Sequence, residues 1–462
     1  MNKFFKYFLK AVKGEVDSFT EGSINSALFL LAVPMILEMM MEALFALVDA
    51  FFISRLGSED ALATIGLTET FMFIIMSVAL GISSAATAMV SRRIGEDKPD
   101  EATYAGIQSI FLALITSVIL GAVGFLYAPD LLRLMGGRES LVTEGSSYCR
   151  IMLTFNIVLV MLFVINAIFR GAGNASIAMR TLWLANGINI VLDPCLIFGL
   201  WFFPELGLKG AAIATCIGRG IGVLYQLYYL INGKSLIKVT VRHLKIIKEM
   251  LFKQIKVAIG GAGQYLLTTI SWILVIRIIA EFGSDALAGY TVAMRVIMFT
   301  ILPSWGLSMA ASTLVGQNLG AGKADRAEAS AWKAAYYNML FLASVSVLAF
   351  FVAPPVISVF SDDPEVIANG VLALRIICAG YIFYAYEMVL GQSFNGAGDT
   401  YTPTLLNFIA FVLIQVPLAY FLAISVGLGP KGVYISIAFS SAILAVMAII
   451  VFKKGKWKQV EI

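Results

Sequence analysis

Long apolar stretches separated by short polar segments dominate the hydrophobic pattern of this chain. Each stretch can supply the roughly 20 residues that an α-helix needs to cross the hydrocarbon core of a bilayer. Several are longer, which indicates tilt or an extension into water rather than an additional span. The pattern predicts an all-α membrane protein with twelve transmembrane helices, over 26–54, 61–90, 103–127, 146–169, 175–200, 209–232, 256–281, 286–318, 328–352, 366–393, 402–426 and 432–453.

The second half of the chain repeats the first. The sequence GISSAA that starts at Gly81 returns as GLSMAA at Gly306, and FRGAGN at Phe169 returns as FNGAGD at Phe394, an offset of 225 residues both times. A repeat that keeps its register over so long a stretch predicts one fold built twice. In membrane transporters such paired repeats enclose the substrate site.

The repeat divides the chain into an N-lobe over 1–231, a cytoplasmic connector over 232–256 and a C-lobe over 257–462. Within the connector, residues 241–251 alternate apolar and basic side chains at helical spacing. This spacing predicts an amphipathic helix on the anionic inner leaflet. His243 is the single histidine of the chain, and we expect it to be a solvated residue of this connector.

Composition agrees with a membrane protein. Hydrophobic residues make up 60% of the 462 positions, charged residues 13%, and the mean hydropathy is +0.88. Soluble domains contain about 45–50% apolar and about 25% charged residues. The net charge of +4 comes from basic residues in the segments predicted to face the cytoplasm, among which we place Arg170. It does not indicate nucleic acid as a partner.

The positions of those basic residues predict the orientation. They concentrate at the N-terminus, after the second span, in the connector and at the C-terminus. The positive-inside rule therefore places both termini in the cytoplasm, and we expect a multi-pass protein of the plasma (inner) membrane. With an even number of spans in each half, the two lobes are parallel repeats about an axis along the membrane normal.

Sequence signatures of catalysis are missing. The chain contains neither a Gly-x-Ser-x-Gly nucleophile motif nor a His-Glu-x-x-His metal motif, and it has no complete phosphate-binding loop. We therefore expect a protein that is not an enzyme, that uses no cofactor and that is not driven directly by ATP. We also expect it to act as a monomer.

Carboxylic side chains inside the predicted spans are the main candidates for chemistry. A carboxylate in the middle of a bilayer costs about 2.5–3.5 kcal/mol on insertion scales, so each requires a reason. Five of the six lie in the first half of the chain; the set is Glu38, Glu42, Asp49, Glu69, Asp193 and Glu387.

Three of these acids share one face of the first span. Glu38, Glu42 and Asp49 are four and seven residues apart, which places them along one side of a helix. Glu38 and Glu42 are candidates for a substrate cavity, and pairing with polar neighbours across the bundle is the alternative. Pro34 lies one turn before Glu38, where it frees the carbonyl of Leu30 and allows the helix to bend.

A second cluster surrounds Asp193. Asn189 lies one turn earlier on the same helix face, and Pro194 frees the carbonyl of Ile190 nearby. Carboxylate, amide and backbone oxygens are ligands suited to a small hard cation. Burial of a carboxyl group also favours reversible protonation. The residues are therefore compatible with a sodium site and with a proton site.

Arginines in the second half leave two readings open. Arg277 and Glu281 are four residues apart and suit a structural pair, whereas Arg295 has no local partner. Glu387 is a candidate partner for Arg375, in which case Glu387 is structural. The roles of Glu69 and of these C-lobe residues are not assigned by the sequence.

Several motifs together resemble the multidrug and toxic compound extrusion (MATE) family over nearly the whole chain. Those that carry the resemblance are Pro34, Leu47-Val48-Asp49 leading to Arg55-Leu56-Gly57, Asn166 to Gly173, Leu192-Asp193-Pro194, Gly210 to Thr215, Val315 to Gly320 and Gly396 to Thr400. The resemblance implies a V-shaped pair of six-helix lobes. It also implies cation-coupled efflux of amphipathic organic cations.

The resemblance carries residue roles with it. In the branch with its coupling site in the N-lobe, the ion residues fall here on Asp49, Asn189, Asp193 and Thr215. Substrate-cavity positions fall on Tyr148 and Asn166, and the bending proline on Pro34. The other branch uses carboxylates in the C-lobe, whose positions fall near Thr268 and on Tyr384; neither is acidic, although Glu387 is one turn from Tyr384.

Three hypotheses follow. The leading one is an antiporter that exports drug-like cations in exchange for Na⁺ or H⁺ bound at the N-lobe acids. A flippase for lipid-linked precursors is the alternative, and it requires a cationic cavity; Arg277, Arg295 and Arg375 lining the cavity favour it. An intramembrane enzyme or a purely structural membrane protein is the third, disfavoured by the missing catalytic motifs and by the buried acids.

Overall fold

The computed structural model describes residues 3–15, 18–55, 59–233 and 235–462. Leu56 and Gly57 of the predicted motif lie outside these residues. The described part consists of helices joined by turns and loops, without strands. Eleven of its helices, or up to twelve spans if a bent pair counts as one, are long and apolar enough to cross a membrane. The predicted fold class is confirmed.

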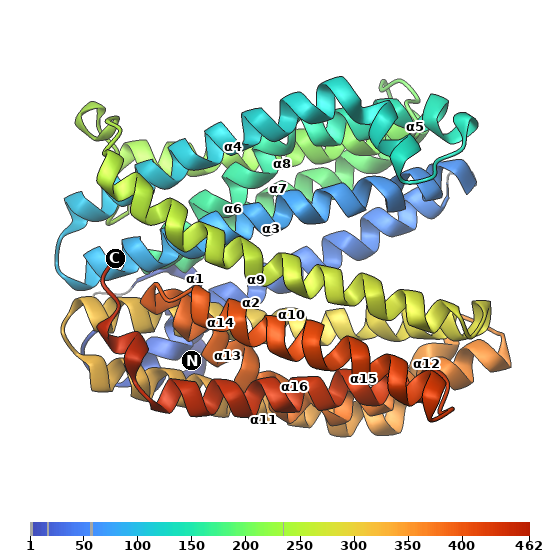
Figure 1. The fold of residues 1–462 in the computed structure, drawn as a ribbon. Coiled ribbons are helices and arrows are strands. Elements are labelled where there is room, and N and C mark those ends of the chain that lie inside the picture. The colour runs from blue at the N-terminus through green and yellow to red at the C-terminus, as the bar shows by residue number, and fades with distance from the viewer. Residues whose placement is uncertain (1–2, 16–17, 56–58, 234) are drawn as a thin grey trace.

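The first half forms one bundle, drawn from blue to green in Figure 1. A short helix, α1 (Lys3–Lys13), precedes the bundle. α5 and α6 form one span, because only one non-helical residue, Phe155, separates them. The bundle contains α2 (Ile24–Ser54), α3 (Glu59–Gly95), α4 (Pro99–Leu134), α5 (Glu139–Thr154), α6 (Asn156–Gly171), α7 (Ala175–Phe198) and α8 (Leu208–Asn232).

The second half forms a matching bundle. α12 (Pro364–Ala379) and α13 (Tyr381–Ala397) meet at 56° at Gly380 and together make one span. Another span runs through α14 (Tyr401–Asn407), η2 (Phe408–Gln415), α15 (Val416–Tyr420) and η3 (Phe421–Ser425). The remaining elements are α9 (Lys248–Ala280), α10 (Ser284–Gly320), α11 (Ala324–Ser358), α16 (Pro430–Lys453) and η4 (Lys456–Gln459).

The two bundles meet where α3 packs against α10 and where two further pairs, α3 with α9 and α2 with α10, lie together. These pairs are equivalent under the sequence repeat. A β-carbon at Gly81 in α3 would lie 2.5 Å from the carbonyl oxygen of Ala258 in α9, and one at Gly306 in α10 would lie 2.7 Å from that of Met35 in α2. The repeated glycines therefore permit the backbones of the two lobes to touch, as small residues do between membrane helices.

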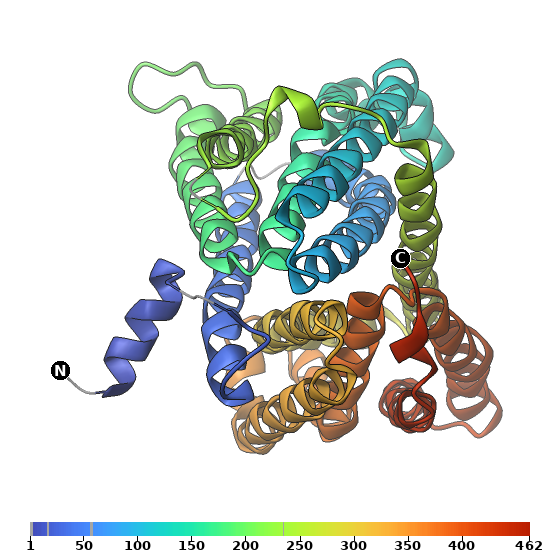
Figure 2. The same cartoon turned by 90° about the vertical axis from the view of Figure 1, so that its left-hand side faces the viewer.

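The lobes are closed against each other at the end that carries α1 and the last residues of the chain, on the left of Figure 1. There, a β-carbon at Gly95 would overlap the carbonyl of Gln317, and one at Gly320 would overlap that of Arg92. Gln317 also donates from Nε2 to the carbonyl of Gly171 over 2.9 Å. We call these contacts the closed seam. Figure 2 views the molecule from this end.

The C-terminal segment also joins the lobes at this end. Arg92 donates to the carbonyl of Val460 (2.5 Å) and Arg93 to that of Ile462 (2.9 Å). The same segment is fixed to the C-lobe, because Trp457 stacks on Phe452 with 4.4 Å between the ring centroids. Residues 455–462 therefore bridge the N-lobe and the C-lobe.

The connector departs from the sequence expectation. The amphipathic helix predicted over 241–251 is wrong: η1 (Val241–His243) is a single 3₁₀ turn, and α9 begins at Lys248. A side chain of α4 forms hydrogen bonds with two backbone groups that would be paired within such a helix. Gln108 donates to the carbonyl of Lys245 (2.8 Å) and accepts from the amide of Ile247 (3.0 Å).

His243 is buried rather than solvated, so that expectation was also wrong. Its side chain is 1% exposed and packs edge-on against the Tyr104 ring, 4.7 Å between centroids. Its Nδ1 accepts from the amide of Thr240 over 3.1 Å. The connector is thus docked on the start of α4, and His243 serves to hold it there.

Candidate functional site

The predicted coupling residues of the N-lobe come together where α2, α7 and α8 meet. Asp49 comes from α2, Asn189 and Asp193 from α7, and Thr215 from α8. With its nitrogen facing Asp193, the Asn189 amide donates to Oδ2 of Asp193 (2.7 Å) and accepts from the amide (2.9 Å) and hydroxyl (3.1 Å) of Thr215. The spacing of Asn189 and Asp193 on one helix face therefore predicted a contact that the structure contains.

Asp49 and Asp193 form the acidic pair of this site. Their carboxyl groups are within hydrogen-bonding contact of each other. Oδ1 of Asp193, which is 0% exposed, finds no donor in the part of the chain that the structure describes. Two carboxylates in contact repel unless a proton or a cation lies between them. The acidic pair, with the Asn189 and Thr215 oxygens, is a donor set that suits Na⁺ or a shared proton.

Glu42 lies two turns along α2 from Asp49 and has partners of its own. Its Oε2 accepts from Asn186 over 2.9 Å, and its Oε1 is 3.6 Å from a guanidinium nitrogen of Arg219. The guanidinium also lies over the Phe45 ring, 5.7 Å from its centroid. Arg219 is absent from the sequence predictions, although it follows the predicted residue Thr215 by one helical turn.

Glu38 is locked into the interior of the N-lobe. It is 1% exposed, pairs with Arg170 at 2.7 Å and accepts from Asn166 over 3.1 Å. Gln226 donates to the Asn166 side chain over 2.6 Å. Arg170, which was counted with the cytoplasmic cations, lies in the last turn of α6 and is only 3% exposed. Its charge is buried because Glu38 lies opposite.

Tyr148 and Pro34 occupy positions beside these groups. Tyr148 is 6% exposed and packs with Ile53 and Ile197, next to the acidic pair. Pro34 lies inside α2, which continues through it as one helix. The turn that contains Pro34 is the one that touches Gly306 across the lobe interface.

A large cavity lies mainly in the C-lobe. Its volume is about 540 Å³, enough for a drug-sized ligand. α9, α10, α13 and α16 supply most of its wall, and α2 and α3 close it from the N-lobe. Aromatic rings and methionines dominate the lining, among them Phe73, Trp272, Tyr290, Met294, Met298, Trp305, Tyr381, Tyr384 and Met388.

Among the described residues that line this cavity, Glu42 and Glu387 are acidic and none is basic. Of the four side chains predicted for a substrate cavity, Glu42 lines it, whereas Glu38, Asn166 and Tyr148 do not. The last three lie in the N-lobe interior. A flexible, polarizable wall of aromatic and methionine side chains with separate negative charges suits organic cations.

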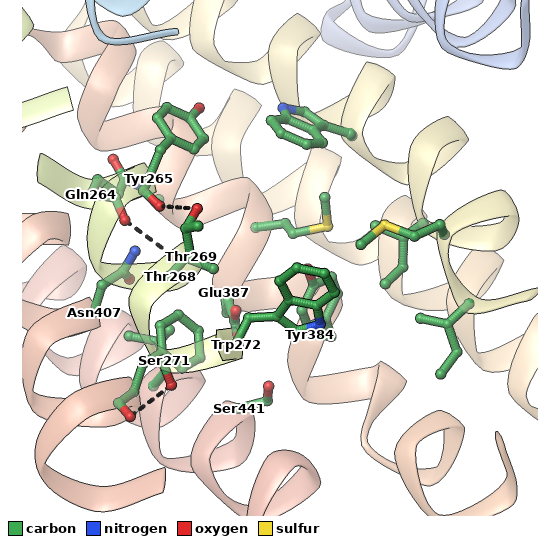
Figure 3. A pocket seen from close by; sticks show the side chains of 18 of the residues that line it. Gln264, Tyr265, Thr268, Thr269, Ser271, Trp272, Tyr384, Glu387, Asn407 and Ser441 are labelled. Carbon is green, nitrogen blue, oxygen red and sulfur yellow. Dashed lines mark hydrogen bonds between the residues drawn. The ribbon is translucent and has the colours of Figure 1, made fainter. Parts of the chain in front are cut away.

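Glu387 is the acid of the C-lobe wall. Figure 3 shows it beside Trp272, Tyr384 and Ser441, which come from α9, α13 and α16. Ser441 is a hydrogen-bonding partner of its carboxyl group, and Oε2 has no partner among the described residues. Its position one turn after Tyr384 was the sequence signal for this role.

The C-lobe arginines do not reach the cavity. Arg375 donates to the carbonyl of Phe350 (3.0 Å) and lies over the Phe350 ring, 5.0 Å from its centroid, so it does not pair with Glu387. Arg277 and Arg295 are also outside the described lining. Both are exposed on the surface of their helices. The three arginines whose presence in the cavity would favour a flippase therefore do not line it.

Comparisons with known proteins agree with this architecture. A family model described as MatE matches residues 34–195 and 262–421, corresponding parts of the two lobes. The probable multidrug resistance protein NorM of Thermotoga maritima is 27% identical over 440 residues, 94% of each chain. The FAD transporter of Shewanella oneidensis is 26% identical over 396 residues, 86% of this chain and 87% of its own.

A solved structure is also similar over nearly the whole length. It is described as the outward-facing conformation of a multidrug resistance MATE family transporter of the MOP superfamily. The TM-score is 0.90 at 25% sequence identity, with 98% of this chain and 99% of the other covered. The two chains therefore share the same two-lobe fold.

Proposed function

The chain belongs to the MatE family, and on that premise we propose that it is a secondary antiporter that exports amphipathic organic cations in exchange for Na⁺ or H⁺. The observation that carries the proposal is the cavity of about 540 Å³, lined by aromatic and methionine side chains with Glu42 and Glu387 as its acidic residues. Such a wall attracts a lipophilic cation through the ring faces and the carboxylates. It offers no described basic group to an anion.

The acidic pair supplies the coupling site in this proposal. Asp49 and Asp193 bind one cation or share one proton, and Asn189 and Thr215 orient the Asp193 carboxylate. A cation in an apolar, mostly buried site interacts strongly with its surroundings because screening by water is weak there. Binding of the ion therefore changes the electrostatic potential at charged groups on the same helices.

Alternation of access follows from the joints of the fold. The closed seam has to part when the transporter opens toward the end that carries the termini. Pro34 lies in the turn of α2 that touches α10, so bending at Pro34 changes the contact between the lobes. We propose that ion binding at one end of α2 and bending at the other are the two linked events.

A flippase for lipid-linked precursors is the weaker candidate. A pyrophosphate or sugar phosphate requires cationic groups in the cavity, and Arg277, Arg295 and Arg375 are not part of its described lining. The FAD transporter among the relatives is named for a cargo that contains a pyrophosphate, whereas no described residue lining the cavity of this chain is basic.

The function is tested with purified protein in vesicles loaded with ethidium, a fluorescent organic cation. A Na⁺ gradient and a proton gradient are imposed in separate experiments, and vesicles loaded with carboxyfluorescein, an anion, serve as the contrast. We expect one of the gradients to accelerate ethidium efflux and neither to move carboxyfluorescein. Efflux of carboxyfluorescein in place of ethidium, or ethidium efflux that ignores both gradients, contradicts the proposal.

A further inference from the structure

Arg219 lies between two acids that the proposed function uses separately. On α2, Glu42, Phe45 and Asp49 follow one another at spacings of three and four residues, so they line one face of the helix. The Arg219 guanidinium comes from α8 and lies over the middle residue of the three, 5.7 Å from the Phe45 ring centroid. It is therefore placed between the cavity-lining acid and an acid of the coupling site.

The contact with Glu42 is a loose one. Its closest N···O distance is 3.6 Å, compared with 2.7 Å for the fully buried pair of Arg170 and Glu38 in the same lobe. Arg219 also interacts electrostatically with Asp49, which follows Phe45 by one turn of α2. The two side chains of the loose pair are 13% and 20% exposed, so neither is packed as tightly as Arg170 and Glu38.

The charges of the N-lobe interior explain why a mobile cation is needed there. Arg170 neutralises Glu38, and Arg219 is left to serve Glu42 and the acidic pair together. One guanidinium cannot neutralise all of them. An additional cation, the coupling ion, therefore changes how the Arg219 charge is divided between Asp49 and Glu42.

We propose that Arg219 transmits the occupancy of the acidic pair to the substrate cavity. When the pair is empty, Asp49 attracts the guanidinium away from Glu42, and Glu42 presents its charge to a cationic substrate. When an ion occupies the pair, it repels the guanidinium along the Phe45 face toward Glu42, and the neutralised cavity releases the substrate. The direction is that of an exchanger, because ion and substrate each weaken the binding of the other.

Arg219 is a positioning residue in this scheme, since it contacts neither ion nor substrate. Asn186 holds the other carboxylate oxygen of Glu42, Oε2, over 2.9 Å, and so keeps Oε1 directed at Arg219. Thr215, one turn before Arg219 on α8, contacts Asn189 of the coupling site. α7 and α8 therefore position both the Glu42–Arg219 contact and the coupling site. This inference rests on the proposed function.

The test measures ethidium binding by purified protein at zero and at saturating concentration of the coupling ion, Na⁺ or H⁺, identified by the vesicle experiment. In the wild type we expect the ion to raise the ethidium Kd by a factor in the range of about 5–150, typical of coupled sites. In Arg219→Gln we expect that factor to fall close to one, with ethidium and ion each still bound. Arg219→Lys keeps the charge and should retain part of the factor.

Controls separate this role from a structural one. Arg150→Gln removes a guanidinium that also lies over a phenylalanine ring, 5.8 Å from the Phe125 centroid, and it should leave the factor unchanged. Glu42→Gln/Arg219→Gln removes both charges of the loose pair, which keeps the protein testable if Arg219→Gln alone does not fold. The double variant should bind ethidium with no ion response.

The outcomes distinguish the two proposals. A wild-type factor retained in Arg219→Gln, or in the double variant, overturns the role of Arg219 and leaves the antiporter standing. A wild-type protein whose ethidium affinity ignores both Na⁺ and H⁺ overturns the proposed coupling and this inference with it. A factor near one in Arg219→Gln and an unchanged factor in Arg150→Gln support the inference.

Discussion

Arg170 and Glu38 show how this protein places a full charge inside a membrane bundle. The two side chains are 4% and 1% exposed and meet at 2.7 Å, and Asn166 donates to the same carboxylate oxygen. Removing one member of a buried pair leaves an uncompensated charge and typically costs about 3–5 kcal/mol. Replacing both with apolar groups is often close to neutral.

We therefore expect Arg170→Met to lower the melting temperature of the detergent-solubilised protein strongly. Glu38→Leu/Arg170→Met should recover most of the loss. Thermal unfolding followed by tryptophan fluorescence measures both variants. Wild-type stability in the single variant would mean that Glu38 is not confined by this pair, and its assignment to a substrate cavity would return.

Glu387 is the acid whose change should affect substrate rather than ion. Its carboxyl group faces the cavity beside Trp272 and Ser441. A bond that involves a charged group contributes about 1.5–3 kcal/mol, so Glu387→Gln should weaken ethidium binding roughly tenfold or more. The ion response should remain. Fluorescence titration checks this, with Arg375→Gln as the control that should bind normally; equal binding by Glu387→Gln contradicts the cavity assignment.

At the scale of the element, α2 joins the coupling acid to the lobe interface. Pro34 removes one backbone hydrogen bond of this helix. Pro34→Ala restores that bond and stiffens the helix, which adds about 1–1.5 kcal/mol to the free energy of bending. We therefore expect gradient-driven ethidium efflux to be about tenfold slower, with an unchanged ethidium Kd. Efflux from vesicles and equilibrium binding measure the two quantities. Unchanged efflux would mean that α2 need not bend.

The closed seam makes a separate prediction for α3 and α10. A β-carbon at Gly320 overlaps the carbonyl of Arg92, so Gly320→Ala should hold the lobes apart at that end. A cysteine introduced at Thr313, which lies on α10 near the seam and donates to the carbonyl of Arg170, should then react faster with a water-soluble maleimide. Gly187→Ala is the matched control, because a β-carbon at Gly187 meets nothing within 4 Å. Equal labelling in both variants would contradict the seam.

The sequence predicted best those features that depend on spacing along one helix. The twelve spans, the two equivalent lobes and the approach of Asn189 to Asp193 follow from apolar length, from the repeat and from a four-residue spacing. The partner of each buried acid depends on how helices cross, which spacing does not contain. Hence the pairing of Arg170 with Glu38 was not predicted, and Arg219, which lies among the N-lobe acids, was missed.

The connector was mispredicted for a related reason. Its apolar and basic residues have helical spacing, but Gln108 of α4 bonds to its backbone and holds it in an irregular form. His243 is buried against Tyr104 by the same docking. A contact with another element decided the local structure in both cases, and a sequence window of the connector alone cannot contain it.

For the whole molecule, the two lobes share a fold and differ in their polar groups. The N-lobe interior contains the acidic pair, the loose Glu42–Arg219 pair and the buried Arg170–Glu38 pair. The C-lobe contributes most of the large apolar cavity, with Glu387 as its acid. In the proposed mechanism, one lobe binds the driving ion and the other holds most of the cargo. α2 and α3 of the N-lobe line part of the same cavity.

That division is tested most directly by gradient-driven ethidium efflux from vesicles, comparing the wild type with Asp49→Asn and Asp193→Asn. Asp130→Asn, a change at an exposed aspartate of α4, is the control. The account predicts that both N-lobe variants lose the acceleration by the gradient while they still bind ethidium, and that the control behaves as the wild type does. Undiminished gradient-driven efflux in both N-lobe variants would contradict it.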